Sequence, residues 1–240
     1  FMNCPLSNII IESNSSVNLD TNCFQGSKNL GIITISGKNV TLNDGCFQNC
    51  PSLKTIVFHP VSNVTLGSSV FLKCPQLTYI NIETGSNLTI GESCFKGLNI
   101  SNVSLQSGGN IRIAKNSFQN CSFISSLEIP KAKEIVLESE AFSGCKNLED
   151  IEIKSSKLTV GTWCFYCNAS LKAIKIETEE LNLFENCFSK LEKLATVELK
   201  CKDIITQQNC FCRCISLKNV SLPDSENVTF GHNSFDGCCS

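Results

Sequence analysis

Residues 46–58, CFQNCPSLKTIVF, contain a pattern that the rest of the chain repeats. The pattern is Phe-x-x-Cys-x-x-Leu-x-x-Ile-x-Ile, carried here by Phe47, Cys50, Leu53, Ile56 and Phe58. It begins again, with small variations, at eleven phenylalanines: Phe1, Phe24, Phe47, Phe71, Phe95, Phe118, Phe142, Phe165, Phe188, Phe211 and Phe235. Successive members of this series are 23 or 24 residues apart, so the chain is an array of equivalent units.

This period predicts the architecture. A repeat of about 20–29 residues with a Leu-x-x-Leu-x-Leu core is typical of a leucine-rich-repeat solenoid. Each coil needs its neighbours to bury its apolar face, and no linker interrupts the series, so residues 1–240 are expected to form a single domain. Solenoids need polar caps at their ends, and neither end has one, so we expect an uncapped segment of a longer protein.

Each coil shows two stretches of strand periodicity. The aliphatic residues that end each pattern alternate with polar ones, and they run from Leu6, Ile9 and Ile11 to Leu217, Val220 and Leu222. A second alternating pair follows, as in Val64-Thr65-Leu66, and a glycine ends it in four coils, at Gly67, Gly91, Gly161 and Gly231. We expect these glycines to occupy tight turns that do not tolerate a Cβ. The prediction is a mainly β solenoid of 23–24-residue coils, with a parallel sheet on the concave face, a second short strand on the opposite wall and little helix.

The pattern resembles the BspA-like (Treponema-type) leucine-rich repeat over essentially the whole chain. The resemblance rests on Cys-Phe or Ala-Phe pairs such as Cys46-Phe47 and Ala141-Phe142, the cysteine or small residue three positions on, and the Leu-x-x-Ile-x-Ile strand. This family occurs in surface proteins of bacteria and of anaerobic protist parasites such as trichomonads, and a parasite of that kind is the expected source. The resemblance implies cell-surface display, in a membrane-anchored parent protein, and adhesion to host-cell or extracellular-matrix proteins. It implies no catalytic residues.

Composition argues against several function classes. The net charge is −2 and there are only two arginines, so no clustered basic face for nucleic acid is expected. No apolar run reaches the ~18 residues needed to span a bilayer, so no membrane insertion is expected within this segment. The only histidines, His59 and His232, lie many coils apart, which argues against a histidine-dependent catalytic centre. We expect no enzyme activity and no cofactor.

Most of the seventeen cysteines occupy two repeat positions, immediately before the phenylalanine and three residues after it. Other coils place Val70, Ala141 or Leu98 at these positions, which favours core slots filled by packed, reduced thiols. Disulfides between stacked coils remain an alternative, with Cys50–Cys74, Cys121–Cys145 and Cys214–Cys238 as candidate pairs. A zinc site at Cys164-x-x-Cys167 or Cys210-x-Cys212-x-Cys214 is disfavoured, because neither cluster has four matched ligands or a nearby histidine.

Ten Asn-x-Ser/Thr sequons occur in the chain. Eight are candidate glycan acceptors if the parent protein enters a eukaryotic secretory pathway: Asn14, Asn39, Asn63, Asn87, Asn99, Asn120, Asn168 and Asn227. Alternatively, an Asn- and Ser-rich turn composition generates them, and the shared repeat phase of Asn39, Asn63, Asn87 and Asn227 favours that origin. Glycans at the other two, Asn102 and Asn219, would obstruct the sheet face.

The outward residues of the main strand are the candidate partner-binding surface. Its N-terminal half is apolar and aromatic, and its C-terminal half is charged; the selected contact residues are Ile10, Ile32, Val57, His59, Tyr79, Asn81, Glu128, Asp150, Glu152 and Lys175. Exposed apolar surface with an aromatic anchor is typical of an interaction site, whereas opposite charges on a sheet also pair with one another in solvent. The predicted function is a surface adhesin; the alternatives are a passive structural stalk and an intracellular interaction scaffold.

Overall fold

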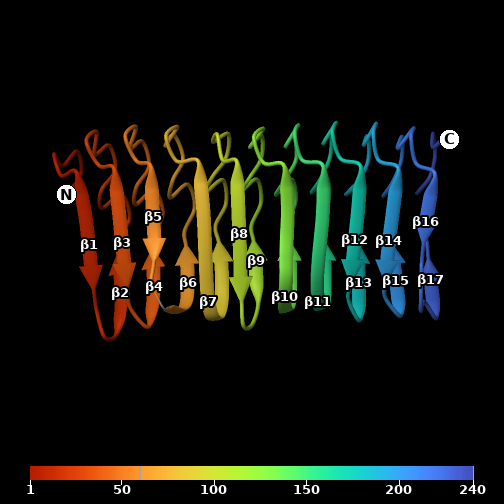
Figure 1. Ribbon diagram of the computed structural model, residues 1–240, viewed down its shortest axis with the longest axis horizontal. Coiled ribbons are helices and arrows are strands. Elements are labelled where there is room, and N and C mark those ends of the chain that lie inside the picture. The colour runs from red at the N-terminus through yellow and green to blue at the C-terminus, as the bar shows by residue number, and fades with distance from the viewer. Residues whose placement is uncertain (60, 240) are drawn as a thin grey trace.

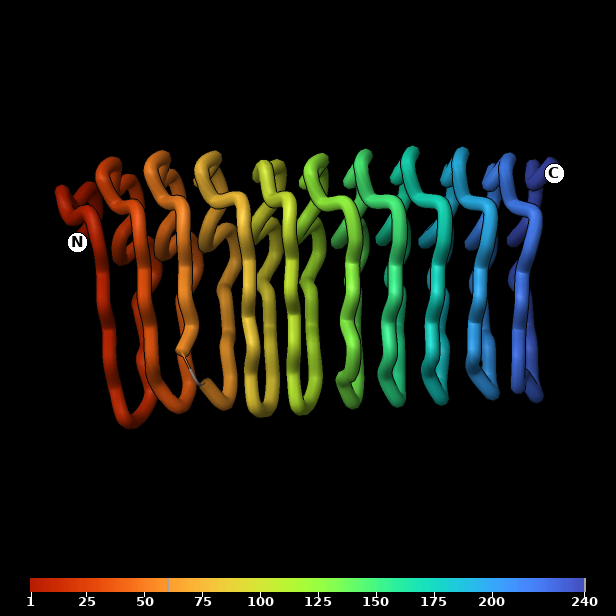
Figure 2. Tube along the Cα trace, in the orientation of Figure 1, coloured from red at the N-terminus to blue at the C-terminus, as the bar shows by residue number. Residues whose placement is uncertain are grey.

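The computed structural model describes residues 1–59 and 61–239. The chain forms a right-to-left stack of coils that follow one another side by side, with the two termini at opposite ends of the row (Figures 1 and 2). Strands form two walls, and a turn-rich segment that contains the phenylalanine closes each coil. No helix occurs among the described residues, which agrees with the predicted solenoid.

Each coil contributes one strand segment to each wall. The strands of the first wall are β1 (Asn8–Glu12), β3 (Ile32–Ser36), β5 (Thr55–Phe58), β8 (Asn102–Ser107), β12 (Ala173–Glu177), β14 (Thr196–Lys200) and β16 (Asn219–Ser221). Those of the second wall are β2 (Ser16–Leu19), β4 (Asn39–Leu42), β6 (Val61–Leu66), β9 (Ile111–Ile113), β13 (Glu180–Leu183), β15 (Asp203–Thr206) and β17 (Asn227–Thr229). Three long strands run through both walls: β7 (Tyr79–Ile90), β10 (Ser126–Leu137) and β11 (Asp150–Val160). In these three coils the two expected strands are therefore continuous.

The strands pair in parallel, and equivalent repeat positions lie opposite one another. Ile9, Ile33 and Ile56 follow one another on the first wall, and Val40, Val64 and Leu88 on the second. A one-residue slip would turn the aliphatic side chains outward, so the period-2 pattern specifies this register. The aliphatic columns of the two walls face each other and form the core.

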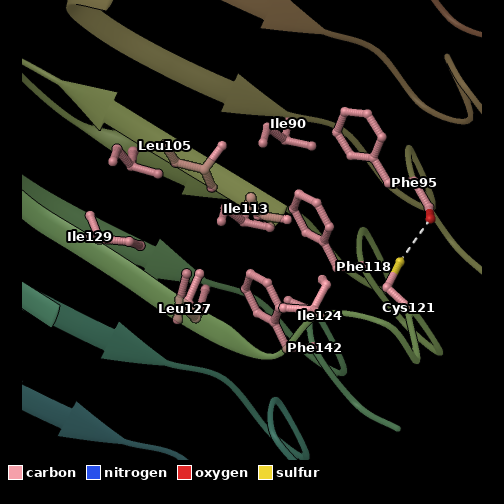
Figure 3. Close-up of a cluster of buried hydrophobic side chains, with 14 of the residues drawn as sticks. Ile90, Phe95, Leu105, Ile113, Phe118, Cys121, Ile124, Leu127, Ile129 and Phe142 are labelled. Carbon is pink, nitrogen blue, oxygen red and sulfur yellow. Dashed lines mark hydrogen bonds between the residues drawn. The ribbon is translucent and has the colours of Figure 1, made fainter. Parts of the chain in front are cut away.

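A continuous row of phenylalanine rings closes the third side of the core. All eleven repeat phenylalanines stack on their neighbours, with ring centroids 5.0–6.0 Å apart and interplanar angles of 3–20°. Figure 3 shows Phe95, Phe118 and Phe142 in this row, next to the aliphatic side chains of the two walls. Aromatic pairs add to the stabilisation from buried area, so the row links each coil to the next.

The coils at the two ends depart from the expected burial. Leu6 and Val220, which the pattern places inward, are both exposed, whereas their equivalents in the inner coils are buried. A terminal coil has a neighbour on one side only, so its inward residues are incompletely covered.

Two positions in each coil have a left-handed backbone, two residues before and two residues after the phenylalanine. Asparagine is the commonest side-chain-bearing residue at these positions: Asn3, Asn22, Asn49, Asn116, Asn120, Asn186, Asn209 and Asn233. Asparagine adopts this conformation more readily than most residues because its short polar side chain bonds locally. Part of the high asparagine content therefore reflects the turn geometry.

The four repeat glycines have a different role from the one expected. Gly67, Gly91, Gly161 and Gly231 are absent from the positive-φ positions. Instead, a Cβ at Gly91 would lie 2.3 Å from the backbone of Gly67, and one at Gly231 would lie 2.3 Å from Gln207. The glycines are needed because the preceding coil approaches closely, and not because the backbone turns through a left-handed conformation.

Candidate functional site

The first wall presents a patch of apolar and polar side chains near the N-terminal end. We call Ile10, Ile32, Val57, His59, Tyr79 and Asn81 the N-terminal patch. Ile10 is 70% exposed, Tyr79 48% and Ile32 46%, whereas Val57 is half-buried. Ile10 and Val57 both pair with Thr34, one from each neighbouring strand. The structure therefore brings these predicted contact residues together on one face of four consecutive coils.

The hydrogen-bonded ladder of the first wall is interrupted within this patch. β1, β3 and β5 form one sheet, and β7 belongs to the large sheet, so β5 and β7 are not paired. Val57 lies on one side of this interruption and Tyr79 on the other. The patch is thus located where neighbouring coils are joined through their side chains and the second wall, and not through the first-wall backbone.

Coil length accounts for this irregularity. Phe47 and Phe71 are 24 residues apart, whereas the two coils before them have 23 residues each. The extra residue falls in the bend between β5 and β6, and the register with β7 shifts between Val61 and Asn63. A longer bend at the third coil displaces its first-wall strand relative to the next one.

Two hollows flank the N-terminal patch. One, of about 470 Å³, lies at the bend and is lined by Phe58, His59 and Glu83 among others. The second, of about 570 Å³, lies at the other end of the strands and is lined by Asn8, Gly31 and Ile32 among others. A partner that lies along these strands would therefore find recesses at both ends of the apolar surface.

The C-terminal half of the first wall is a solvated array of charges. Glu128, Glu152 and Lys175 are aligned on consecutive strands, and Asp150 lies one position pair earlier. Glu152 pairs with Lys154 at 3.3 Å, and Glu177 with Lys200 at 3.5 Å, with all four side chains more than two-fifths exposed. Exposed pairs of this kind contribute about 0–1 kcal/mol each, so this half has little that would anchor a partner.

Asparagines of the second wall form a ladder of side-chain hydrogen bonds. Asn39 donates to Ser16 at 3.2 Å, Asn63 to Asn39 at 2.8 Å and Asn87 to Asn63 at 3.0 Å. Asn227, in the same repeat phase, donates to Asp203 at 2.7 Å. These contacts give a structural reason for asparagine at this position that is independent of glycosylation.

The remaining sequons differ in accessibility. Asn14, Asn99 and Asn120 are exposed, as an acceptor must be. Asn168 is 0% exposed, and neither its amide oxygen nor its amide nitrogen has a hydrogen-bond partner. It occupies the core slot three residues after Phe165 that holds cysteine in most coils, so its proposed role as a glycan acceptor is wrong for the folded chain.

All seventeen cysteines are free, and none of the three candidate pairs is bridged. The slot after the phenylalanine positions each thiol against the preceding coil. Cys74 donates to the Phe47 carbonyl at 3.1 Å, and Cys121 to the Phe95 carbonyl at 3.1 Å, as Figure 3 shows. Cys50, Cys145, Cys214 and Cys238 make the equivalent contact at 3.2–3.4 Å. These cysteines are therefore structural, and each links two coils through a weak hydrogen bond.

The second wall also exposes apolar side chains that the sequence reasoning missed. Phe184 and Ile205 are exposed on β13–β15, and Trp163 is exposed in a left-handed turn. The alternation along each second strand could have identified Ile205. The exposure of Trp163 follows from a turn conformation that a bulky residue rarely adopts, and the sequence gives no signal for it.

Within residues 1–59 and 61–239 there is no cluster of three or more His, Cys, Asp or Glu side chains suited to a metal ion. The same residues contain no helix that could cross a bilayer.

The two parallel walls, the in-register columns and the continuous sheet faces define a leucine-rich-repeat solenoid, an architecture that provides extended surfaces for protein interaction. The chain belongs to the family described as the BspA type leucine rich repeat region, whose matches cover residues 1–122 and 111–240. It is similar to a leucine-rich repeat protein from Bacteroides ovatus, with 18% identity, coverage of 97% of this chain and 87% of that one, and a TM-score of 0.34. A leucine-rich repeat protein from Eubacterium ventriosum has 12% identity, with 97% and 80% coverage and a TM-score of 0.34. No curated protein matches the chain.

Proposed function

We propose that this chain is a non-enzymatic, surface-displayed adhesin module that binds a host-cell or extracellular-matrix protein through the N-terminal patch. The observation that carries the proposal is the exposure of Ile10, Ile32 and Tyr79 on one rigid sheet face. BspA-type repeats are common in surface proteins, which supports display outside the cell.

The patch has the character of a binding surface. Exposed apolar side chains gather on neighbouring strands there, with Tyr79 as an aromatic anchor. Tyrosine is enriched among the residues that dominate binding energy, because it buries a large area at little cost in side-chain entropy. The stacked phenylalanines hold the coils in place, so binding would require little rearrangement of the face.

Replacing Ile32, Val57 and Tyr79 together with serine is expected to weaken capture of the partner by at least about 100-fold. The three side chains are at least partly solvent-exposed, so the fold should persist. The measurement is biolayer interferometry against a panel of purified matrix proteins, together with flow cytometry of labelled protein on host cells.

The matched control changes charges on the other half of the same face. A variant with Glu128→Gln, Asp150→Asn and Lys175→Gln should retain capture, since these residues lie in the solvated array. Equal capture by the wild type and the serine variant would contradict the proposal, and would favour the passive stalk or the intracellular scaffold.

A eukaryotic secreted origin, such as a protist parasite, has a separate test. Asn14, Asn99 and Asn120 are exposed and are the proposed glycan acceptors among the turn sequons. The intact mass of protein isolated from its own source is expected to fall after treatment with an N-glycosidase, and Asn168 is expected to remain unmodified. A mass that does not change would contradict glycosylation and remove the support that the sequons give to surface display.

A further inference from the structure

The hollow at the bend between the third and fourth coils differs from the other bends of the solenoid. Its volume is about 470 Å³, and its lining includes Phe58, His59, Val61, Glu83, Thr84 and Gly85. It adjoins the N-terminal patch through His59 and the interruption between β5 and β7. An inference about it therefore concerns the same surface as the proposed function and rests on that function.

Thr84 places an unsatisfied hydroxyl at this hollow. The residue is 4% exposed, and its Oγ1 has no hydrogen-bond partner. Ser107, which pairs with Thr84 in the next coil, donates to the Ser86 carbonyl. Thr178 in a later coil donates to the Glu180 carbonyl at 3.1 Å. Equivalent hydroxyls are thus satisfied within the protein, and a buried hydroxyl without a partner is costly.

The neighbouring Glu83 supplies an uncompensated charge. Its side chain is exposed and makes no hydrogen bond or ion pair with any other described residue. Phe58 and Val61 provide apolar surface in the same hollow. The lining therefore combines a free carboxylate, a free hydroxyl acceptor and an apolar wall.

We propose that this hollow receives an arginine side chain of the protein that binds the N-terminal patch. The planar guanidinium donates two parallel hydrogen bonds to a carboxylate, here that of Glu83, and its remaining N–H groups can donate to the Thr84 hydroxyl. The aliphatic part of the side chain packs against Phe58 and Val61, because long basic side chains bury their stems on apolar surface. The partner segment consequently has an arginine next to the apolar residues that cover Ile32 and Tyr79.

The test uses N-acetyl-arginine amide as a probe and N-acetyl-citrulline amide as its neutral isostere. NMR titration of the whole chain is expected to shift the Gly85 amide resonance with the arginine probe and not with the citrulline probe. Glu83→Gln should weaken binding of the arginine probe by at least about tenfold, because it removes the charge while keeping the shape. Thr84→Val should weaken it by about threefold, and the variant should fold, since the hydroxyl has no partner in the free protein.

The outcomes separate this inference from the proposed function. Ile32→Ser with Tyr79→Ser should leave binding of the arginine probe unchanged while abolishing capture of the protein partner. The inference is overturned if Gly85 does not respond, if citrulline binds as well as arginine, or if Glu83→Gln binds as well as the wild type. Loss of probe binding only in Glu83→Gln, with partner capture unaffected by the patch variants, would support the hollow and contradict the proposed function.

Discussion

Phe118→Ala is expected to lower the free energy of unfolding by about 3–5 kcal/mol. The ring is fully buried and stacks on Phe95 and Phe142, with both centroid distances 5.0 Å. Truncation therefore removes two aromatic contacts and leaves a cavity in the middle of the row, where the surrounding coils cannot close it. Urea unfolding followed by far-UV circular dichroism measures the loss.

The same coil offers a matched control. Phe123 is 54% exposed, so Phe123→Ala is expected to change the free energy of unfolding by no more than about 0.5 kcal/mol. Because each coil contacts only its neighbours, Phe118→Ala should also separate the unfolding of the two halves into two transitions. An equal effect of the two substitutions would contradict a stabilising role for the phenylalanine row.

Alkaline pH is expected to unfold the chain through its buried thiols. Burial raises the pKa of Cys46, Cys121 and Cys214 from 9.0 to about 12. Below pH 9 these thiols are protonated in the folded and the unfolded chain, so their stabilising contribution is complete. Above pH 9 the unfolded chain releases their protons while the folded chain retains them, and the free energy of unfolding falls until about pH 12.

The expected loss is about 1.4 kcal/mol per pH unit for each thiol, and about 4 kcal/mol per pH unit for the three together. Domains are typically stable by about 5–15 kcal/mol, so this loss is large enough to unfold the chain within a few pH units. The measurement is the midpoint of urea unfolding at a series of pH values above 9. Thiol alkylation in parallel should label Cys239, which is exposed, well before the buried cysteines.

A cysteine-to-alanine variant isolates the contribution of the thiols. Ala141 fills the slot before the phenylalanine in one coil, so Cys46→Ala is a substitution that the repeat itself contains. Combining it with Cys121→Ala and Cys214→Ala should lower stability at neutral pH but flatten its dependence on alkaline pH. A pH dependence as steep as that of the wild type would assign the alkaline transition to other groups.

The sequence alone determined the repeat, the strands and the core. The spacing of the phenylalanines predicted the solenoid, and alternation such as that in Val64-Thr65-Leu66 predicted the second wall. The exchange of cysteine with Val70 and Ala141 predicted packed thiols. These features are predictable because each depends on the local period and on which face of a strand a residue occupies, and both can be read along the chain.

The tertiary structure alone decided how neighbouring coils meet. It buried Asn168 in a cysteine slot, required glycine at Gly91 because Gly67 lies against it, and left Thr84 without a partner beside an open hollow. It also interrupted the ladder between β5 and β7 inside the N-terminal patch. These features depend on the contact between two coils that differ in length by one residue, and such a contact between backbones leaves no periodic signal in either coil.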